Sequence, residues 1–153
     1  MYFSPSERAL GDIVKKVENE ERLSKNDGIR LLESYDLLSI GYMANIVRMR
    51  KNTENICLDC KDGSLLEMNA SEDLIDHLIH VREQQDINCA YQAFNPIALH
   101  SQTSTTGFED LKILAVSRLM LDNFPQIITL SITLGTKLAQ IAHSFGVDYQ
   151  EGF

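Results

Sequence analysis

The chain is short of cysteine, of long hydrophobic runs and of positive charge. Three cysteines are too few, and odd in number, for a disulfide framework, so they indicate free thiols or metal ligands in a reducing compartment. No stretch reaches the roughly 20 apolar residues of a membrane span, and the N-terminus lacks the features of a signal peptide. We therefore expect a cytoplasmic protein without membrane contact. With 14 basic against 22 acidic residues, the net charge of -8 argues against a nucleic-acid partner.

Several catalytic signatures are also missing. The sequence has no Gly-x-Gly-x-x-Gly, no Walker loop and no Gly-x-Ser-x-Gly elbow, which leaves phosphate cradling and triad hydrolysis without support. A complete (β/α)₈ barrel takes about 250 residues, or about 200 in compact cases, so 153 residues are too few to form one. The length and the 44% apolar content fit one globular domain over residues 1–153.

What is present is a helical first half followed by alternating helices and strands. Capping residues and the helical spacing of apolar side chains predict helices, and β-branched or apolar runs predict strands. The Asp62-Gly63 pair predicts a turn, and hence a short hairpin near 55–68. We expect helices over 5–20, 24–33, 36–50, 71–86, 108–123 and 137–145, and parallel strands over 91–98 and 127–133.

These elements define the expected fold class: a helix-rich α/β chain in three parts. Residues 1–52 form a helical lead-in, residues 53–70 a bridging hairpin or loop, and residues 71–153 an α/β segment with parallel strands and right-handed crossovers. Two strands cannot close a barrel.

Few residues are candidates for chemistry. Cys57 and Cys60 form a Cys-x-x-Cys pair that could bind a metal or cycle as a dithiol, but no second pair follows, and unliganded thiols are the competing interpretation. His77 and His80 stand three residues apart on an expected helix, where a mixed-charge surface is the simpler explanation. His100 follows the first expected strand, at the end where parallel sheets place ligand-contacting groups.

Two blocks of the sequence resemble a known family. The first block consists of Glu21-Arg22-Leu23-Ser24, Asp27-Gly28, Leu31-Leu32-Glu33-Ser34, Asp36-Leu37-Leu38, Ile40-Gly41, Ala44-Asn45, Val47-Arg48 and Arg50-Lys51-Asn52. The second consists of Asp76-His77-Leu78, Arg82-Glu83-Gln84-Gln85-Asp86, Ala93-Phe94-Asn95-Pro96, Asp110-Leu111-Lys112, Ala115-Val116-Ser117-Arg118-Leu119-Met120-Leu121-Asp122-Asn123, Leu134-Gly135, Lys137-Leu138-Ala139-Gln140 and Phe145-Gly146-Val147-Asp148. Both are similar to aminofutalosine synthase, a radical S-adenosylmethionine (SAM) enzyme of the futalosine route to menaquinone, and cover about two thirds of the chain.

The resemblance implies a fold and a reaction. In the family the first block leads into a (β/α) barrel and the second closes it, so this chain would be a partial barrel remnant. The family reaction cleaves SAM reductively and adds the adenosyl radical to 3-[(1-carboxyvinyl)oxy]benzoate. Its cofactors are SAM and a 4Fe-4S cluster held by Cys-x₃-Cys-x₂-Cys. Here Cys57 and Cys60 echo that loop without the first cysteine, so we expect neither cofactor to bind in the family's way.

The expected function is therefore that of an aminofutalosine synthase-like protein that an internal deletion between the blocks has impaired. Asn95, where the family is apolar, and His100 are the expected substrate-binding residues, chosen for their strand-end position. Two alternatives stay open: a non-catalytic α/β module that binds a ligand or partner, and a gene-model artefact. Open sheet edges would favour self-association.

Overall fold

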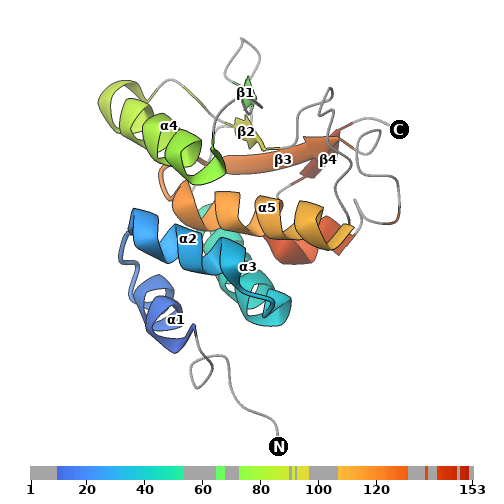
Figure 1. The fold of residues 1–153 in the computed structure, drawn as a ribbon. Coiled ribbons are helices and arrows are strands. Elements are labelled where there is room, and N and C mark those ends of the chain that lie inside the picture. The colour runs from blue at the N-terminus through green and yellow to red at the C-terminus, as the bar shows by residue number, and fades with distance from the viewer. Residues whose placement is uncertain are drawn as a thin grey trace, which may run out of the picture.

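The computed structural model describes residues 10–53, 65–67, 73–89, 91, 93–96, 107–130, 137, 141–147 and 149–151 (Figure 1). Among these residues, helices form one side of the molecule and a parallel sheet the other. None of the described helices is long and apolar enough to cross a membrane.

Three helices form the lead-in, as expected: α1 (Gly11–Glu18), α2 (Lys25–Glu33) and α3 (Leu37–Thr53). Ser24 caps α2 in a capping box, because its hydroxyl accepts from the Asp27 backbone N–H while the Asp27 carboxylate accepts from the Ser24 backbone N–H. The start of α1 expected at Pro5 lies outside the described residues. Helix α2 therefore begins and ends where capping and periodicity place it, whereas α1 begins at Gly11, six residues after the expected start.

The sheet contains four strands in the described residues, all parallel and in the order β1-β2-β3-β4. They are β1 (Leu65–Glu67), β2 (Ala93–Asn95), β3 (Gln126–Leu130) and β4 (Tyr149–Glu151). Helix α4 (Leu74–Asn88) connects β1 to β2, and α5 (Gly107–Met120) connects β2 to β3. The short 3₁₀ helix η2 (His143–Phe145) precedes β4. Each strand thus pairs with its neighbour in sequence, with no reversal of order.

This sheet extends the sequence-based expectation and corrects part of it. The two predicted parallel strands are present as β2 and β3, but β1 and β4 add two more. Residues 65–67, which were expected to form one arm of a hairpin, instead pair in parallel with β2, Leu65 beside Ala93 and Glu67 beside Asn95. The other expected arm lies outside the described residues. Short strands of three residues carry too little periodicity to be recognised alone.

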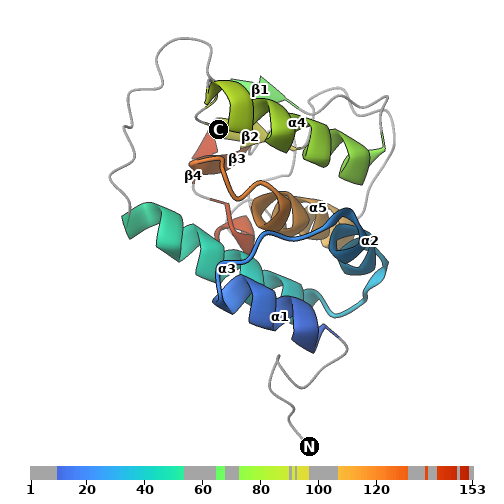
Figure 2. The same ribbon diagram turned by 90° about the vertical axis from the view of Figure 1, so that its left-hand side faces the viewer.

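The described elements form layers. Helices α4 and α5 lie against one face of the sheet, and α2, α3 and α1 lie beyond them (Figure 2). Because successive strand residues point to opposite faces, Phe94 and Ile127 belong to the core on the helix side. Phe94 contacts the Phe124 ring, 5.8 Å away between centroids. Ala93, Asn95, Gln126 and Ile128 alternate with these two, so they occupy the other face, where they are also buried.

Candidate functional site

The carboxyl edge of the parallel sheet is the candidate site, since α/β proteins place ligands outside the carboxyl ends of parallel strands. Strand β2 ends at Asn95. This residue is 1% exposed and lies on the face of the sheet that points away from the helices. Its register partner is Glu67, the last residue of β1. Asn95 therefore places a polar side chain at the edge where sequence reasoning expected one.

The chemistry of this side chain is that of an amide. An amide donates two hydrogen bonds and accepts others, and it does not titrate. Asn95 is therefore suited to orient a ligand and not to transfer a proton. Gln126, 7% exposed, is a second amide on the same face, at the amino end of β3. Whether Asn95 binds substrate stays a prediction.

The other predicted site residues are not brought to this edge by the described part of the chain. His100, Cys57 and Cys60 lie outside the described residues. Cys89 is described and exposed, and it ends α4 with a left-handed φ of 49°. Since α4 leads into the amino end of β2, Cys89 lies at the opposite edge of the sheet. The described residues contain no group of three or more His, Cys, Asp or Glu side chains able to bind a metal.

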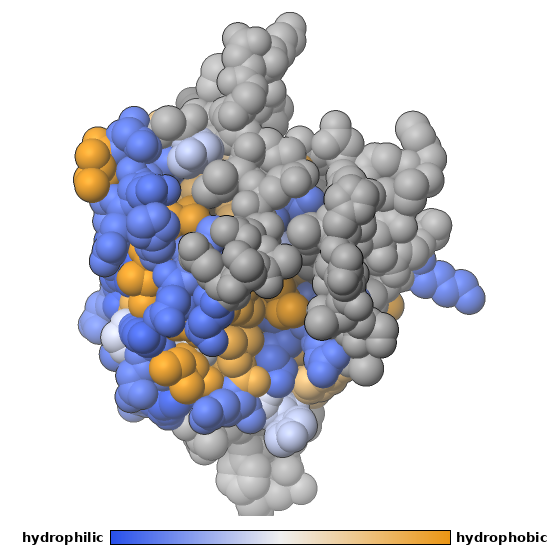
Figure 3. Space-filling view, turned by 45° about the horizontal axis from the view of Figure 1, so that its top comes forward, coloured by the Kyte–Doolittle hydropathy of each residue, from blue (hydrophilic) through white to orange (hydrophobic). Residues whose placement is uncertain are grey.

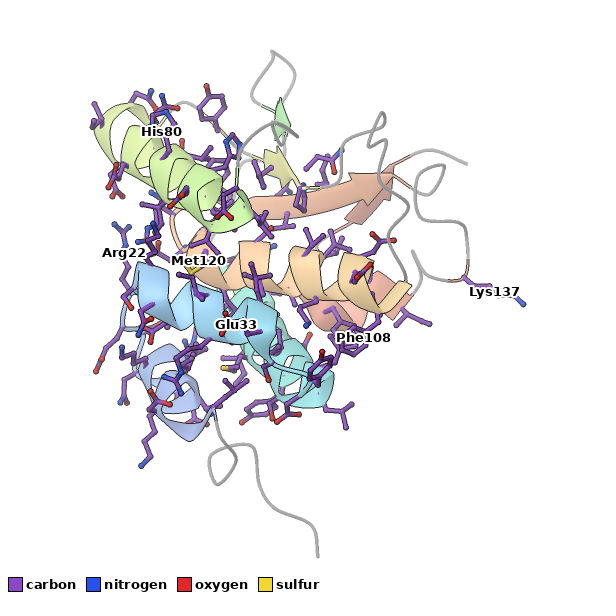
Figure 4. All side chains as sticks on the ribbon, in the orientation of Figure 1. Arg22, Glu33, His80, Phe108, Met120 and Lys137 are labelled. Atoms are coloured by element: carbon purple, nitrogen blue, oxygen red, sulfur yellow. The ribbon has the colours of Figure 1, made fainter. Side chains whose placement is uncertain are left out.

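The paired histidines occupy different environments on α4. His77 is 7% exposed and its ring lies 6.3 Å from that of Phe94, in the layer between helix and sheet. His80, labelled in Figure 4, is exposed. Their separation argues for a packing role for His77 and a surface role for His80, so the expected mixed-charge surface holds for His80 and is wrong for His77.

A charged cluster at the amino edge of the sheet is a feature that sequence reasoning missed. Arg22, from the segment between α1 and α2, binds Asp86 through two hydrogen bonds, Nη1 to Oδ2 at 2.6 Å and Nη2 to Oδ1 at 3.0 Å. Its Nε donates to Asp122 Oδ2 at 3.0 Å. Asn123 Nδ2 donates to Asp86 Oδ1 at 2.7 Å. Figure 4 shows Arg22 and Met120 on the same side of the molecule, at the end of α5.

The cluster lowers the pKa of one carboxyl group and lies beside bonds that join two parts of the chain. The hydrogen bonds from Arg22 lower the pKa of Asp86 to about 2, with Asn123 adding to the effect. Next to the cluster, Arg82 donates from Nη1 to the carbonyl oxygens of Leu23 at 2.9 Å and Met120 at 3.2 Å. These bonds tie the first sequence block to the second. The only signal in the sequence was that Arg22, Asp86 and Asp122 stand within the two blocks.

A second arginine is enclosed in the core. Arg118 on α5 is fully buried, and its Nε donates to the carbonyl oxygen of Gly146 at 2.8 Å. Burial lowers the pKa of Arg118, and nearby Arg48 lowers it further. This bond fixes the backbone just before β4 and so helps to position the last strand in the sheet. Arg118 is therefore not free to reach a ligand.

A cavity of about 200 Å³ lies among α1, α3 and α5, distant from the carboxyl edge. Its lining mixes apolar and charged residues, among them Arg50. Arg50 donates to the carbonyl oxygens of Val17 and Glu18 at the end of α1, where the Val17 oxygen also accepts from the Glu20 backbone N–H. This arginine is therefore committed to closing α1, and the cavity is a packing feature between helices.

The fold and the carboxyl edge of its sheet define the class of protein: a parallel α/β protein with consecutive strand order. No family model matches the chain. It is 37% identical over 92 residues to an aminodeoxyfutalosine synthase of Thermus thermophilus, covering 53% of this chain and 25% of that protein. It is 33% identical over 89 residues to a cyclic dehypoxanthine futalosine synthase of Streptomyces coelicolor, covering 54% and 22%. The chain is thus related to radical SAM enzymes of the futalosine pathway, which confirms the resemblance.

A further relative bears on the region between the blocks. The chain is 31% identical over 136 residues to a 5-amino-6-(D-ribitylamino)uracil–L-tyrosine 4-hydroxyphenyl transferase of Methanoculleus marisnigri, covering 80% of this chain and 36% of that protein. The chain therefore spans about a quarter to about a third of the relatives it matches. An alignment of 136 positions that includes 80% of the chain has no room for a large gap between the blocks. This comparison gives no support to the expected internal deletion.

Proposed function

We propose that the chain is a portion of a radical SAM-type (β/α) barrel, related to aminofutalosine synthase and unable to complete the family reaction alone. The observation that carries the proposal is the consecutive order β1-β2-β3-β4 of parallel strands. A closed (β/α) barrel has this order throughout, whereas a doubly wound sheet reverses it. The relationship to futalosine-pathway enzymes supports the same interpretation.

In this proposal the two faces of the sheet have different purposes. The face with Phe94 and Ile127 packs against α4 and α5, as the outside of a barrel wall packs against its helices. The face with Asn95 and Gln126 corresponds to the barrel interior, where side chains at the carboxyl edge contact ligands. Asn95, with His100 from the following segment, would bind the aromatic acid that the family uses as substrate.

The cluster that starts the family reaction does not fit the donors of this chain. Three thiolates must hold the cluster so that its fourth iron stays open to SAM. Cys57 and Cys60 supply the last two positions of Cys-x₃-Cys-x₂-Cys, and Thr53 stands where the first cysteine is needed. The third cysteine, Cys89, stands 29 positions after Cys60 in the sequence and is not part of this spacing. We therefore derive no step through the cluster, and we expect impaired activity.

Anaerobic reconstitution with iron and sulfide tests this proposal. We expect substoichiometric, labile iron that is lost on desalting, and no stable cluster with the absorption of a 4Fe-4S centre. The double variant Cys57→Ser/Cys60→Ser is the matched control for adventitious iron, and the wild-type chain should differ little from it. About four irons retained per chain, lost in that variant, would show that this donor set suffices and would overturn the proposal.

A non-catalytic binding module is the second candidate, favoured by the buried amide of Asn95 at the carboxyl edge. Titration of the chain with 3-hydroxybenzoate, followed by amide NMR shifts, measures this activity. We expect saturable shifts that Asn95→Leu abolishes and that the surface variant His80→Gln preserves. Unchanged spectra up to millimolar ligand would reject this candidate and the binding role proposed for Asn95, but would leave the barrel relationship of the first proposal unaffected.

Self-association through the sheet edges is a further part of the proposal. Strands β1 and β4 are the outer strands of the described sheet, and an edge strand with unpaired backbone groups is a template for pairing with another chain. A clean monomer in size-exclusion chromatography at high concentration would argue against it.

A further inference from the structure

A buried glutamine in the last turn of α4 bonds to the segments that lead into two strands. Gln85 is 3% exposed. Its side-chain oxygen accepts from the Tyr91 backbone N–H at 3.0 Å, and its Nε2 donates to the Tyr91 carbonyl oxygen at 2.6 Å. The same Nε2 donates to the carbonyl oxygen of Asn123 at 3.3 Å. Tyr91 stands two positions before β2, and Asn123 three positions before β3. One side chain therefore joins the entry of β2 to the entry of β3.

The neighbouring glutamine of α4 has an ordinary surface position. Gln84 is exposed. The surface seen in Figure 3 likewise carries hydrophilic side chains, with separate hydrophobic patches among them. Gln85 instead belongs to the buried face of α4, where Leu78 and Val81 precede it at helical spacing. Burying an amide costs free energy unless its donor and acceptor are bonded, and both are bonded here to backbone groups.

The two bonds between Gln85 and Tyr91 resemble the pairing of neighbouring strands. A strand residue in a ladder finds an acceptor for its N–H and a donor for its C=O on the adjacent chain. A carboxamide carries both groups and can replace that adjacent chain. The described ladders of β2 begin at Ala93, two positions after Tyr91. Gln85 therefore supplies strand-like pairing just before the ladder starts.

These bonds matter because the ladder that follows is short. Strand β2 has three residues, and its described register with β3 begins at Ala93 beside Gln126. A shift of one residue would exchange the two faces of the strand, and so few pairs resist it weakly. The amide of Gln85 holds both strand entries at one point. It thereby sets where Asn95, four positions after Tyr91, lies along the carboxyl edge.

A reciprocal contact joins the same two segments. The side chain of Asn123, which precedes β3, donates from Nδ2 to the carbonyl oxygen of Arg82 at 2.9 Å and to Asp86 Oδ1 at 2.7 Å. Both acceptors belong to the C-terminal part of α4, the part that carries Gln85. Helix α4 and the connection from α5 to β3 are therefore bonded in both directions, which gives the Gln85 amide a fixed base.

From these contacts we propose that Gln85 is a positioning residue of the candidate site. Its amide fixes the register of β2 against β3 and so holds Asn95 at the carboxyl edge. The inference rests on the proposed function in one respect, since the ligand-binding role of Asn95 comes from there. The register itself is a property of the chain and is measured without a ligand.

The variant Gln85→Glu tests the proposal, because protonation restores the group that the substitution removes. The introduced carboxylate cannot donate, and it faces the carbonyl oxygens of Tyr91 and Asn123. Burial, these oxygens and the carboxylate of Asp86 should raise its pKa above the usual value of about 4.3. The bonds should therefore be missing at pH 7 and form again as the pH falls through the raised pKa. Asp86, with a pKa of about 2, and its partner Arg22 stay charged throughout.

Amide hydrogen exchange and backbone NOEs measure the effect on the full chain. In Gln85→Glu at pH 7 we expect the protection factor of the Tyr91 amide to fall at least about tenfold. The NOEs between Ala93 and Gln126 should be lost as well. Both should recover at about pH 5. Gln84→Glu, the matched control on the exposed face of α4, should behave like the wild-type chain at both pH values.

The uncharged variant Gln85→Met covers the case in which Gln85→Glu does not fold at pH 7. It keeps the length of the side chain but makes none of the three bonds. We expect unchanged helix content by circular dichroism, with the same loss of Tyr91 protection and of the Ala93–Gln126 NOEs. This loss should not recover at pH 5, because methionine has no group to protonate.

Three results would overturn the proposal. They are wild-type NOEs between Ala93 and Gln126 in both Gln85 variants, a loss of Tyr91 protection alone, and a defect of Gln85→Glu that persists at about pH 5. The second result would mean that Gln85 closes a turn without setting the register. Titration with 3-hydroxybenzoate adds the site readout: the dissociation constant of Gln85→Glu should exceed that of the wild-type chain at least about tenfold at pH 7 and match it at about pH 5. A wild-type chain that binds no ligand would reject the role of Asn95, and the NOEs would then decide the register.

Discussion

Arg22 and Asp86, 64 positions apart in the sequence, form a two-point ion pair that joins the helical lead-in to the C-terminal end of α4. Asp122 shares the same guanidinium, so three segments meet at one arginine. Because Arg22 stands in the first family-like block and both carboxylates stand in the second, the pair shows that the two blocks fold as partners.

Replacing Arg22 should weaken the attachment of the helical lead-in to the C-terminal end of α4. We expect Arg22→Met to lower the free energy of unfolding by about 1 kcal/mol, a modest value because the pair is partly solvated. Urea unfolding measures the change, and Lys15→Met on α1 is the control for losing an exposed cation. In a double-mutant cycle with Asp86→Asn, the double variant should lose less unfolding free energy than the two single variants lose together. Strict additivity would mean that the pair contributes nothing.

Acid should unfold the chain partly through two carboxylates. The pKa of Asp86, held by Arg22, and that of Asp12, held by Arg30, are both about 2 against a usual 3.8. A depressed pKa in the folded state means that the stabilisation is complete above pH 3.8 and is lost as the pH falls toward 2. The pH dependence of urea midpoints measures this loss. In Asp86→Asn the slope between pH 4 and 2 should be shallower, and an unchanged slope would contradict the assignment.

Gly146 is expected to tolerate no side chain. Its φ is +93°, and an added Cβ would lie 3.0 Å from atoms of both Ala44 and Arg118. Strain and crowding together should cost Gly146→Ala about 2 kcal/mol of stability. Thermal unfolding checks this, with Gly107→Ala at the exposed start of α5 as the comparison. A Gly146→Ala protein as stable as wild type would show that η2 can move away from α5.

Replacing Thr53 by cysteine would complete the Cys-x₃-Cys-x₂-Cys spacing with Cys57 and Cys60. If the missing thiolate is what prevents cluster binding, Thr53→Cys should retain severalfold more iron after anaerobic reconstitution than the wild-type chain. Thr53→Ser is the control for disturbing the end of α3. Equal iron in Thr53→Cys and Thr53→Ser would mean that the surroundings of these cysteines, and not the number of thiolates, limit binding.

Local signals predicted much of the helical half of the fold. Ser24 and Asp27 form the capping box expected from their spacing, and the apolar periodicity of α4 and α5 placed both helices within a few residues. Helix caps and periodicity act over a few residues, so they can be read from the sequence directly.

The sheet was harder to predict, for a physical reason. Strands β1 and β4 are three residues long, and each is recognisable only through the neighbour with which it pairs. The Asp62-Gly63 signal favoured a local hairpin, yet Leu65–Glu67 pairs with residues that follow α4. Parallel pairing is a long-range contact that turn residues do not report.

The candidate site also has residues that local sequence signals predicted and residues that only long-range contacts bring together. Asn95 was predicted from its position at a strand end, and it lies buried at the carboxyl edge. The cluster around Arg22 escaped prediction, because its members are distant in sequence and resemble ordinary surface charges. Cys57, Cys60 and His100 remain predictions.

The formation of 5′-deoxyadenosine from SAM by the anaerobically reconstituted, chemically reduced chain is the most direct test of the account. We predict no 5′-deoxyadenosine above the Cys57→Ser/Cys60→Ser background, because two of the three required thiolates cannot hold a cluster with one iron open to SAM. Cysteine-dependent formation of 5′-deoxyadenosine by the wild-type chain, with about one equivalent of methionine for each nucleoside, would contradict it.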